Sequence, residues 1–216
     1  LLMIRPRLQF ILNLKGCAKN PLVLTGEVMN QEDTLRLASF LQMPALVTSI
    51  NYIRMHLAFL FGYHSVAACL AEKNSDIYSV AFATAITRSH CFLEALNFVA
   101  LARSDATKKK GNIAHAKTNH ERLQKWKKSS KKQYCPLLSL VEAEIISVTD
   151  KPKRAATFYQ SSIQALHMDN CIHTEALAHE LAGNFYRMVA NDQPAAREHA
   201  LQAYDLYIKW GADAKA

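Results

Sequence analysis

The clearest hydrophobic pattern lies in the last third of the chain, where apolar residues recur every three or four positions. This period places them on one side of an α-helix. Two such stripes are separated by Asp150-Lys151-Pro152, where Pro suits the first turn of a new helix. The first stripe comprises Leu137, Leu140, Val141, Ile145 and Val148, and the second comprises Ala155, Ala156, Tyr159, Ile163 and Leu166. The pattern predicts a helical hairpin.

The same arrangement recurs about 40 residues later, with Asn191-Asp192-Gln193-Pro194 as the break. The recurring apolar and small positions are Leu177, Leu181, Phe185 and Met188, then Ala195, His199 and Ala203. Small residues let helices approach closely, and a hairpin repeated at this period is typical of tetratricopeptide-like (TPR-like) arrays. The sequence therefore predicts the all-α class, as a right-handed α-solenoid of stacked antiparallel helical hairpins.

Looser helical patterns precede these hairpins. One helix is predicted over Pro44–Phe61, and Ser65 is predicted to cap a helix over residues 66–72. Asn74-Ser75-Asp76 predicts the cap of a helix that runs to about Arg103. The stripe of the first of these helices comprises Leu46, Ile50, Ile53, Leu57 and Leu60.

The domain organisation follows from these elements. Gly111-Asn112 predicts the start of a helix over about 113–128, and Pro136 predicts the start of the next one. Residues 1–30 form a poorly defined segment with one helix over about 7–14. Residues 31–216 are predicted to be the TPR-like repeat domain.

Composition supports long helices in an intracellular setting. Gly and Pro, which interrupt helices, number only 6 each in 216 residues. Five widely spaced cysteines without a CxxC pair favour buried reduced thiols over a disulfide framework. No apolar run reaches the roughly 18 to 20 residues that a membrane helix needs, so a cytoplasmic location is expected. The chain starts without Met, which favours a fragment of a longer protein over a complete protein with trimmed ends.

Positive charge is concentrated in one segment. Residues 108–132 hold ten Lys or Arg and one acid, Glu121, whereas the remainder holds 16 basic and 17 acidic residues. On a helix, one arc of about 140° carries the cationic side chains and the opposite side carries the apolar ones. The cationic residues are Lys117, Arg122, Lys125 and Lys128, and the opposite residues are Ile113, Ala116, His120, Leu123 and Trp126.

The apolar face of this helix is therefore predicted to pack against the rest of the protein, and the cationic face is predicted to be exposed to solvent. The cationic face suits contact with phosphate, an anionic membrane surface or an acidic partner domain. The alternative is an ordinary solvated face that aids solubility. Aromatic residues do not alternate with the lysines on that arc, so the stacking of nucleic-acid bases is not supported.

Motifs for catalysis and metal binding do not occur. The chain has neither a GxxxxGK[ST] loop nor a GxGxxG, HRD, DFG or GxSxG pattern. His167, Cys171, His173 and His179 lie close in sequence but lack the spacing of a zinc motif. Glu142 and Glu144 are two residues apart and are expected to face different directions. We therefore assign no catalytic, cofactor-binding or metal-binding residue.

Three segments together resemble a known family. Leu137–Glu144 (LLSLVEAE) is similar to its "LLVEAE" helix, and Thr174–Tyr186 (TEALAHELAGNFY) is similar to its "EALANELAARFY" helix. Ala203–Lys215 resembles its "A-Y-x-x-Y-x-x-W-G-A-x-A-K" ending. The family comprises large signalling proteins with a serine/threonine-kinase-like domain, an AAA-type ATPase, a helical repeat region, a GAF domain and a sensor histidine kinase.

The resemblance covers most of residues 55–215 and falls in the helical repeat region of that family. It implies a two-component signalling protein whose ATP sites and phosphoaccepting histidine lie elsewhere, so no cofactor is expected in this segment. Two residues depart from the family pattern, because His179 stands in place of Asn and Gly183 in place of Ala. A Gly inside a helix costs about 0.5 to 1 kcal/mol relative to Ala.

Two functions from different classes follow. The first is a non-catalytic module that scaffolds, binds domains of the same chain or other signalling proteins, and relays signals between the ATPase and the sensor kinase. The second is a basic-helix module that binds nucleic acid or an anionic membrane surface. A stand-alone enzyme is a third reading, and the sequence offers no motif for it.

Overall fold

The computed structural model describes residues 2–80, 85–127, 131–149 and 154–216. Throughout these ranges the regular secondary structure is helical and contains no strand, which confirms the predicted all-α class. The chain divides into two compact units, of which the first comprises Leu1–Asn97 with Ala212–Lys215 and the second Phe98–Gly211 with Ala216. The division falls inside α6 (Ala85–Ser104), and the domain boundary predicted at residue 30 stays a prediction.

The first unit begins with α1 (Arg5–Leu14), which holds the loop that follows it. Asn13 is buried, and its Nδ2 donates to the carbonyl oxygens of Pro21 at 3.0 Å and Val23 at 2.9 Å. Gln9 is also buried and donates through Nε2 to Asn13 Oδ1 at 2.9 Å. Because buried amides need partners, these bonds fix the loop to the helix. The segment that the sequence left poorly defined therefore has specific internal contacts.

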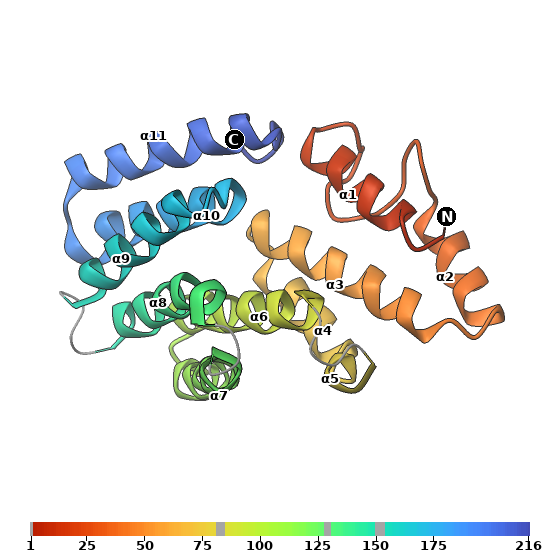
Figure 1. Ribbon diagram of the computed structural model, residues 1–216, viewed down its shortest axis with the longest axis horizontal. Coiled ribbons are helices and arrows are strands. Elements are labelled where there is room, and N and C mark those ends of the chain that lie inside the picture. Colours follow the sequence, from red (N-terminus) through yellow and green to blue (C-terminus); the bar gives the residue numbers. More distant parts are fainter. Residues whose placement is uncertain (1, 81–84, 128–130, 150–153) are drawn as a thin grey trace. The chain divides into compact units, whose positions relative to one another are not determined.

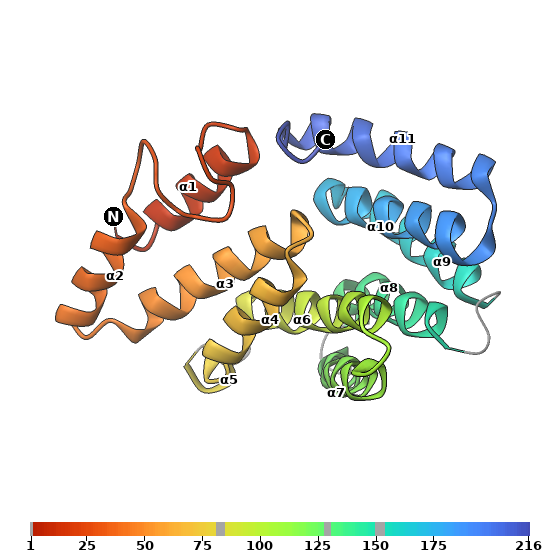
Figure 2. The same cartoon turned by 180° about the vertical axis from the view of Figure 1, so that it is seen from behind.

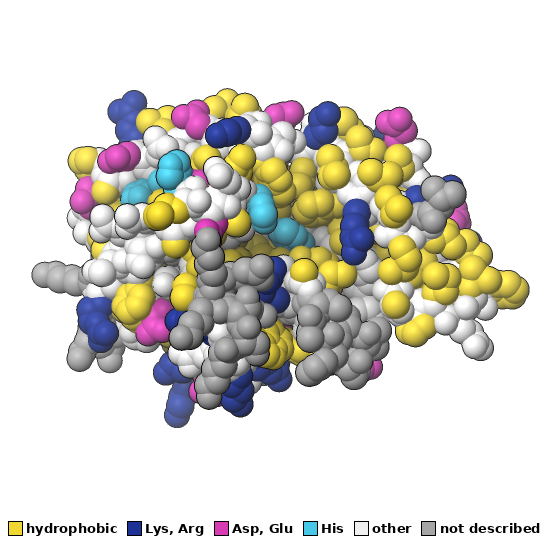
Figure 3. Space-filling model, viewed as in Figure 1, with side chains coloured by type: hydrophobic (Ala, Val, Ile, Leu, Met, Phe, Trp, Pro, Cys, Tyr) yellow, Lys and Arg dark blue, Asp and Glu magenta, His cyan; other side chains and the backbone are white. Residues whose placement is uncertain are grey.

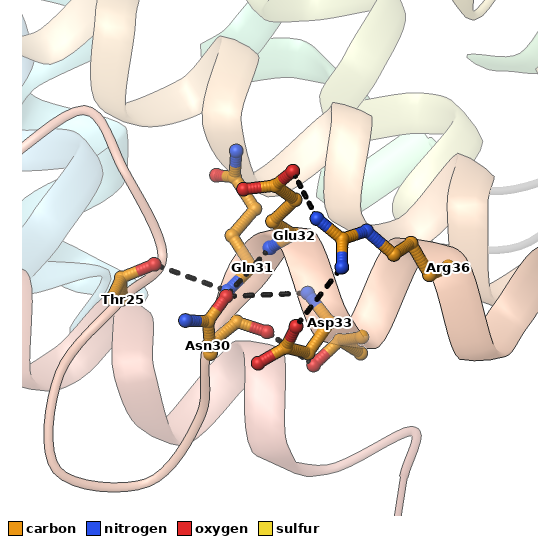
Figure 4. A network of polar contacts seen from close by, with 7 residues as sticks. Thr25, Asn30, Gln31, Glu32, Asp33 and Arg36 are labelled. Carbon is orange, nitrogen blue, oxygen red and sulfur yellow. Dashed lines mark hydrogen bonds and ion pairs between the residues drawn. The ribbon is translucent and has the colours of Figure 1, made fainter.

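The next helix, α2 (Gln31–Phe40), has a well-formed N-terminal cap (Figure 4). Asn30 Oδ1 accepts hydrogen bonds from the backbone N–H groups of Glu32 at 2.9 Å and Asp33 at 3.2 Å. Arg36 then binds Glu32 at 2.5 Å on the exposed side of the helix. An Asn cap contributes about 1 kcal/mol, so this start is set locally by the sequence.

The predicted helix Pro44–Phe61 is confirmed as α3 (Pro44–Leu60), and its five predicted stripe residues are buried. Gly62 ends it with a left-handed φ of 78°. α4 (His64–Lys73) begins at once, so the prediction that Ser65 caps a helix over 66–72 was wrong. The left-handed Gly62 turns the chain within two residues, which leaves Ser65 inside the helix.

The helix predicted from Asn74 to Arg103 corresponds to two elements, α5 (Ile77–Val80) and α6 (Ala85–Ser104). Residues 81–84 between them lie outside the described residues. The Asn74 side chain donates to the carbonyl oxygen of Thr48 at 3.1 Å, and the cap predicted for Asn74-Ser75-Asp76 stays a prediction. The predicted end near Arg103 is confirmed.

The second unit continues with α7 (Lys109–Lys127), α8 (Lys131–Ser147), α9 (Ala155–Met168), α10 (Ile172–Phe185), the π-helix η2 (Tyr186–Ala190) and α11 (Gln193–Trp210). Each of these α-helices contacts the next one in sequence (Figures 1 and 2). The predicted pairs α8–α9 and α10–α11 thus pack as neighbours. No helix in the described part of the chain is long and apolar enough to cross a membrane.

Two helices begin earlier in the sequence than predicted. α7 begins four residues before Ile113, because Asp105 accepts hydrogen bonds from the backbone N–H groups of Thr107 and Lys108 and starts the turn. α8 begins before Leu137 and contains Pro136. Pro136 is only the sixth residue of α8, so it removes a single bond of the helix. The predicted break at residues 150–152 lies outside the described residues.

The second predicted break is confirmed. Asn191 has a left-handed φ of 54°, and Asp192 caps α11 by accepting from the Ala195 N–H at 3.1 Å. Gly211 ends α11 with a left-handed φ of 83°, a conformation that Gly adopts readily. Met188 was wrongly predicted as a core residue and is 58% exposed. It lies in η2, where the wider π-helical turn changes the direction of the side chains.

The five cysteines are free thiols, as predicted. Their predicted burial holds for Cys91 but was wrong for Cys17 and Cys69, which are exposed. Both exposed cysteines lie at the polar edge of a helix or just beyond it, where a small side chain does not reach the core.

Candidate interaction surface on α7

The helix α7 docks through an apolar face, as its sequence pattern predicts. Ala116 and Leu123 are fully buried, and α7 packs against α8. Ile113, His120 and Trp126 are partly buried along the same face. Asn119, which the prediction did not include, is buried between them. Burial of this stripe holds α7 in place and fixes which side chains point outward.

Aromatic and polar contacts complete the docked face. The ring of His115 stacks on Phe98 of α6 with centroids 4.7 Å apart. His120 Nε2 lies 3.2 Å from Glu142 Oε2 on α8. Burial lowers the pKa of His120, although the carboxylate of Glu142 acts in the opposite direction. Glu142 and Glu144 do face different directions, because Glu144 instead meets Arg103.

The opposite side of α7 carries exposed cations. Lys117, Arg122 and Lys125 are all exposed at their predicted positions, whereas Lys128 lies outside the described residues. Lys109 and Lys110 are exposed on the first turn of α7, which the sequence analysis missed because it placed the helix start at Ile113. Figure 3 shows Lys and Arg side chains gathered along the lower edge of the view, where Figure 1 places α7. We call Lys109, Lys110, Lys117, Arg122 and Lys125 the basic face.

The four lysines of the basic face lack a counter-charge among the residues that the structure describes. In the part of the chain that the structure describes, Lys109, Lys110, Lys117 and Lys125 form no ion pair. Arg122 donates to Asn119 Oδ1 at 3.1 Å. Two carboxylates lie near these cations in sequence: Asp105 is occupied by the turn before α7, where the Thr107 hydroxyl lowers its pKa, and the exposed Glu121 of α7 forms no ion pair with Lys117 or Lys125. The four lysines of the face therefore present positive charges that an anion can contact.

An open hollow of about 600 Å³ lies at the N-terminal half of the basic face. Its lining residues come from the turn before α7, from α7 itself and from the second residue after α8. They are Ala106, Lys109, Lys110, Ile113, Ala114, Lys117 and Thr149. Ile113 and the two alanines provide an apolar floor, and the three lysines provide a cationic rim. We call this feature the lysine hollow.

The only signal in the sequence for the lysine hollow was Asp105 followed by Thr107 and Lys108. These residues form a cap, which makes the helix begin earlier in the sequence than Ile113. With that start, Lys110 and Lys117 fall on the same side of the helix as Ala114. Thr149 could not be assigned to the hollow from sequence, because its place depends on how α8 packs against α7.

The histidines that lie close together in sequence have different hydrogen-bond and ring partners in the structure. His167 Nδ1 lies 2.8 Å from Glu175 Oε1, and the His173 ring packs at 5.5 Å from Trp210. His179 Nδ1 lies 3.0 Å from His199 Nδ1 on α11, a pairing that the sequence analysis missed. In the described ranges, no three His, Cys, Asp or Glu side chains are arranged to hold a metal ion.

Three aromatic residues near the end of α11, Tyr204, Tyr207 and Trp210, have different surroundings. Tyr207 is buried and donates its hydroxyl to Glu180 Oε2 of α10 at 2.6 Å, and burial raises its pKa well above the usual value. Trp210 is partly buried beside His173, whereas Tyr204 is 50% exposed. Tyr207 is therefore part of the packed core, whereas Tyr204 is not.

Comparisons with known proteins add no relative. No protein-family model, no curated protein and no solved structure matches the chain.

Proposed function

We propose that this chain is a non-catalytic helical-hairpin module that binds an acidic segment of a protein partner through the basic face of α7. One observation carries the proposal. α7 docks through Ala116 and Leu123, and its opposite side holds lysines without carboxylate partners among the described residues. Charges held on a rigid, docked helix select partners by electrostatic complementarity and speed their association.

A protein partner suits this face better than nucleic acid does. Base stacking needs aromatic side chains among the cations, and the exposed arc of α7 has none at its described positions. The lysine hollow instead combines cations with an apolar floor, which is the composition of a pocket for a protein side chain.

Within the all-α class, we propose that the helices form a right-handed α-solenoid of antiparallel hairpins. Its support is the packing of α8 on α9 and of α10 on α11, with α9 also contacting α10. Such stacking gives each hairpin two neighbours and makes one continuous core. Circular dichroism on fragments that end after α9 should show a loss of helix beyond the residues removed, because α9 loses its contact with α10.

We propose that the chain is part of the helical repeat region of a multidomain signalling kinase, from the family that the sequence resembles. The three resembling segments correspond to α8, to α10 and to α11 with the residues after it. In that context the module would scaffold and relay signals between the ATPase and the sensor kinase. The full reading frame tests this: an AAA-type ATPase before residue 1 and GAF and histidine-kinase domains after residue 216 are expected, and a stop codon after Ala216 would count against it.

The experiment for the basic face measures fluorescence anisotropy of a labelled, Asp- and Glu-rich peptide against the purified chain. Lys117→Glu with Lys125→Glu should weaken binding about tenfold or more, and added salt should weaken wild-type binding steeply. Arg197→Glu with Lys209→Glu is the matched control, because both residues are exposed on α11 and the net charge changes equally. This control should bind like wild type.

Two outcomes would overturn the proposal. Equal weakening by both double variants would mean that net charge, and not α7, governs binding. Tighter binding of single-stranded DNA or of phosphatidylserine vesicles than of the peptide, lost in the α7 variant, would assign the basic face to nucleic acid or to a membrane surface instead.

A further inference from the structure

The lysine hollow has an apolar floor and a sizeable volume in addition to its cationic rim. Its floor consists of Ile113, Ala114 and Ala106, and its volume of about 600 Å³ lies within the roughly 300 to 1,000 Å³ of typical binding pockets. A uniformly charged partner would leave this floor in contact with water. An apolar side chain in the hollow would remove that surface from water, which is favourable.

The positions of the lysines frame the floor. Lys110 and Lys117 are seven residues apart on α7, which places their Cα atoms about 10 Å from each other along the helix. Ile113 and Ala114 lie between them in sequence and line the same hollow. An occupant that enters the hollow therefore has a cation on either side of it along the helix axis.

An extended peptide has matching spacing. Residues i−2, i and i+2 of such a chain point to one side, and the outer two are about 13 Å apart. Lysine side chains are long and flexible, so ammonium groups on Cα atoms about 10 Å apart can reach carboxylates at that separation. The order acidic, apolar, acidic on alternate residues is thus complementary to the rim and floor of the hollow.

We propose that the lysine hollow is the specificity pocket of this module, and that it takes the apolar side chain of an acidic peptide whose neighbouring carboxylates bind Lys110 and Lys117. This inference rests on the proposed function, and it adds which acidic segments are preferred. Lys109 extends the cationic rim by one residue before Lys110. The apolar side chain provides selectivity, and the carboxylates provide attraction and orientation.

The test uses two labelled peptides that contain Glu-Ser-Leu-Ser-Glu and Glu-Ser-Ala-Ser-Glu, measured by fluorescence anisotropy against the full chain. The Leu peptide should bind about tenfold more tightly than the Ala peptide. Ala114→Trp fills the hollow and should abolish that preference. Thr118→Trp is the matched control, because Thr118 is exposed on α7 but does not line the hollow, and it should keep the preference. Circular dichroism checks that both variants remain helical.

The outcomes separate this inference from the proposed function. If both peptides bind equally to wild type, or if Ala114→Trp keeps the preference for Leu, the specificity pocket is wrong while binding of acidic peptides still stands. If neither peptide binds more tightly than versions with Gln in place of Glu, the proposed function itself is wrong. A Lys117→Gln variant should weaken both peptides, since it removes a cation and leaves the floor intact.

Discussion

His179 and His199 face each other across the packing of α10 on α11, with their Nδ1 atoms 3.0 Å apart. One Nδ1 must donate and the other accept, so the pair is held together only while at least one ring is unprotonated there. Tyr186 stacks on the other side of His199, with ring centroids 5.3 Å apart and planes within 7°. The contact therefore links three elements of the second unit, α10, η2 and α11.

Acid should destabilise the chain through this pair. Burial, together with the neighbouring His199 and His167, lowers the pKa of His179 from 6.5 to about 4. Burial also lowers the pKa of His199, although the nearby Glu198 acts in the opposite direction. Above about pH 6.5 the two histidines are neutral in both the unfolded and the folded chain, so the pair contributes its full stabilisation. Between about pH 6.5 and 4 the unfolded chain binds protons that the folded chain does not, and stability falls as the pH falls.

Urea unfolding between pH 4 and 7 measures this effect. Because His179 is partly exposed, we expect its share of the loss to be about 1 to 2 kcal/mol. His179→Asn, which replaces the imidazole with an uncharged amide able to hydrogen-bond, should flatten that part of the curve. Gln202→Asn, at an exposed position of α11 without an ionisable group, is the control and should keep the wild-type slope. An unchanged slope in His179→Asn would show that other groups cause the acid sensitivity.

Gly183 is predicted to be required by the close approach of α10 and α11. A Cβ atom there would lie 3.3 Å from the carbonyl oxygen of Ala196 and 3.5 Å from the backbone nitrogen of Ala200. These are backbone atoms, so crowding costs about 1 to 3 kcal/mol, which exceeds the gain of up to about 1 kcal/mol from helix propensity. Gly183→Ala should therefore lower the free energy of unfolding by about 1 kcal/mol in urea.

Gly111 provides the matched control for Gly183. It is also helical, but a Cβ there would meet no atom within 4 Å. Gly111→Ala should raise the free energy of unfolding by about 0.5 kcal/mol, because only helix propensity changes. If both Gly→Ala variants are stabilised to the same extent, α11 yields readily at Ala196 and Gly183 has no packing role.

The repeat period predicted which positions lie inside a hairpin but not which groups they meet. Tyr159 and His199 occupy equivalent positions about 40 residues apart, and both make polar contacts inside a hairpin. Tyr159 donates to Glu144, whereas His199 faces His179. A periodic pattern fixes the face of a residue, but its partner depends on side-chain length, rotamer and the local rotation of the two helices.

The candidate site was predicted in part for a similar reason. The exposure of Lys117 and Lys125 follows from helical phase alone, and the structure confirms it. The lysine hollow was not predicted, because it needs the true start of α7 and the position of Thr149 after α8. Helix ends are set by a few local hydrogen bonds, such as those of Asp105, and these are weak signals in a single sequence.

The buried ion pair of Arg103 and Glu144 should be the most sensitive polar contact of the second unit. Arg103 Nη1 donates to Glu144 Oε2 at 2.5 Å, and the Tyr159 hydroxyl donates to Glu144 Oε1. Burial acts to lower the pKa of Arg103, but the carboxylate of Glu144 outweighs it and raises that pKa. Glu144→Gln leaves a buried cation without its counter-charge and should cost about 3 kcal/mol in urea unfolding.

Glu142→Gln is the matched control for Glu144→Gln, because Glu142 lies on the same helix with a side chain that is 38% exposed. It should change the free energy of unfolding by less than about 0.5 kcal/mol. A cost for Glu144→Gln as small as that of Glu142→Gln would mean that water reaches Arg103 and replaces the lost charge.

Tyr207 and Tyr204, three residues apart on α11, should respond differently to loss of the same hydroxyl group. The Tyr207 hydroxyl donates to Glu180 at 2.6 Å in a buried setting, whereas the Tyr204 side chain is 50% exposed. A hydrogen bond to a charged acceptor contributes about 1.5 to 3 kcal/mol, so Tyr207→Phe should lower the unfolding free energy by about that amount. Tyr204→Phe should be neutral within about 0.5 kcal/mol, because water satisfies its hydroxyl. Thermal and urea unfolding of both variants measure the difference, and equal losses would show that the bond across α10 and α11 adds nothing beyond the tyrosine ring.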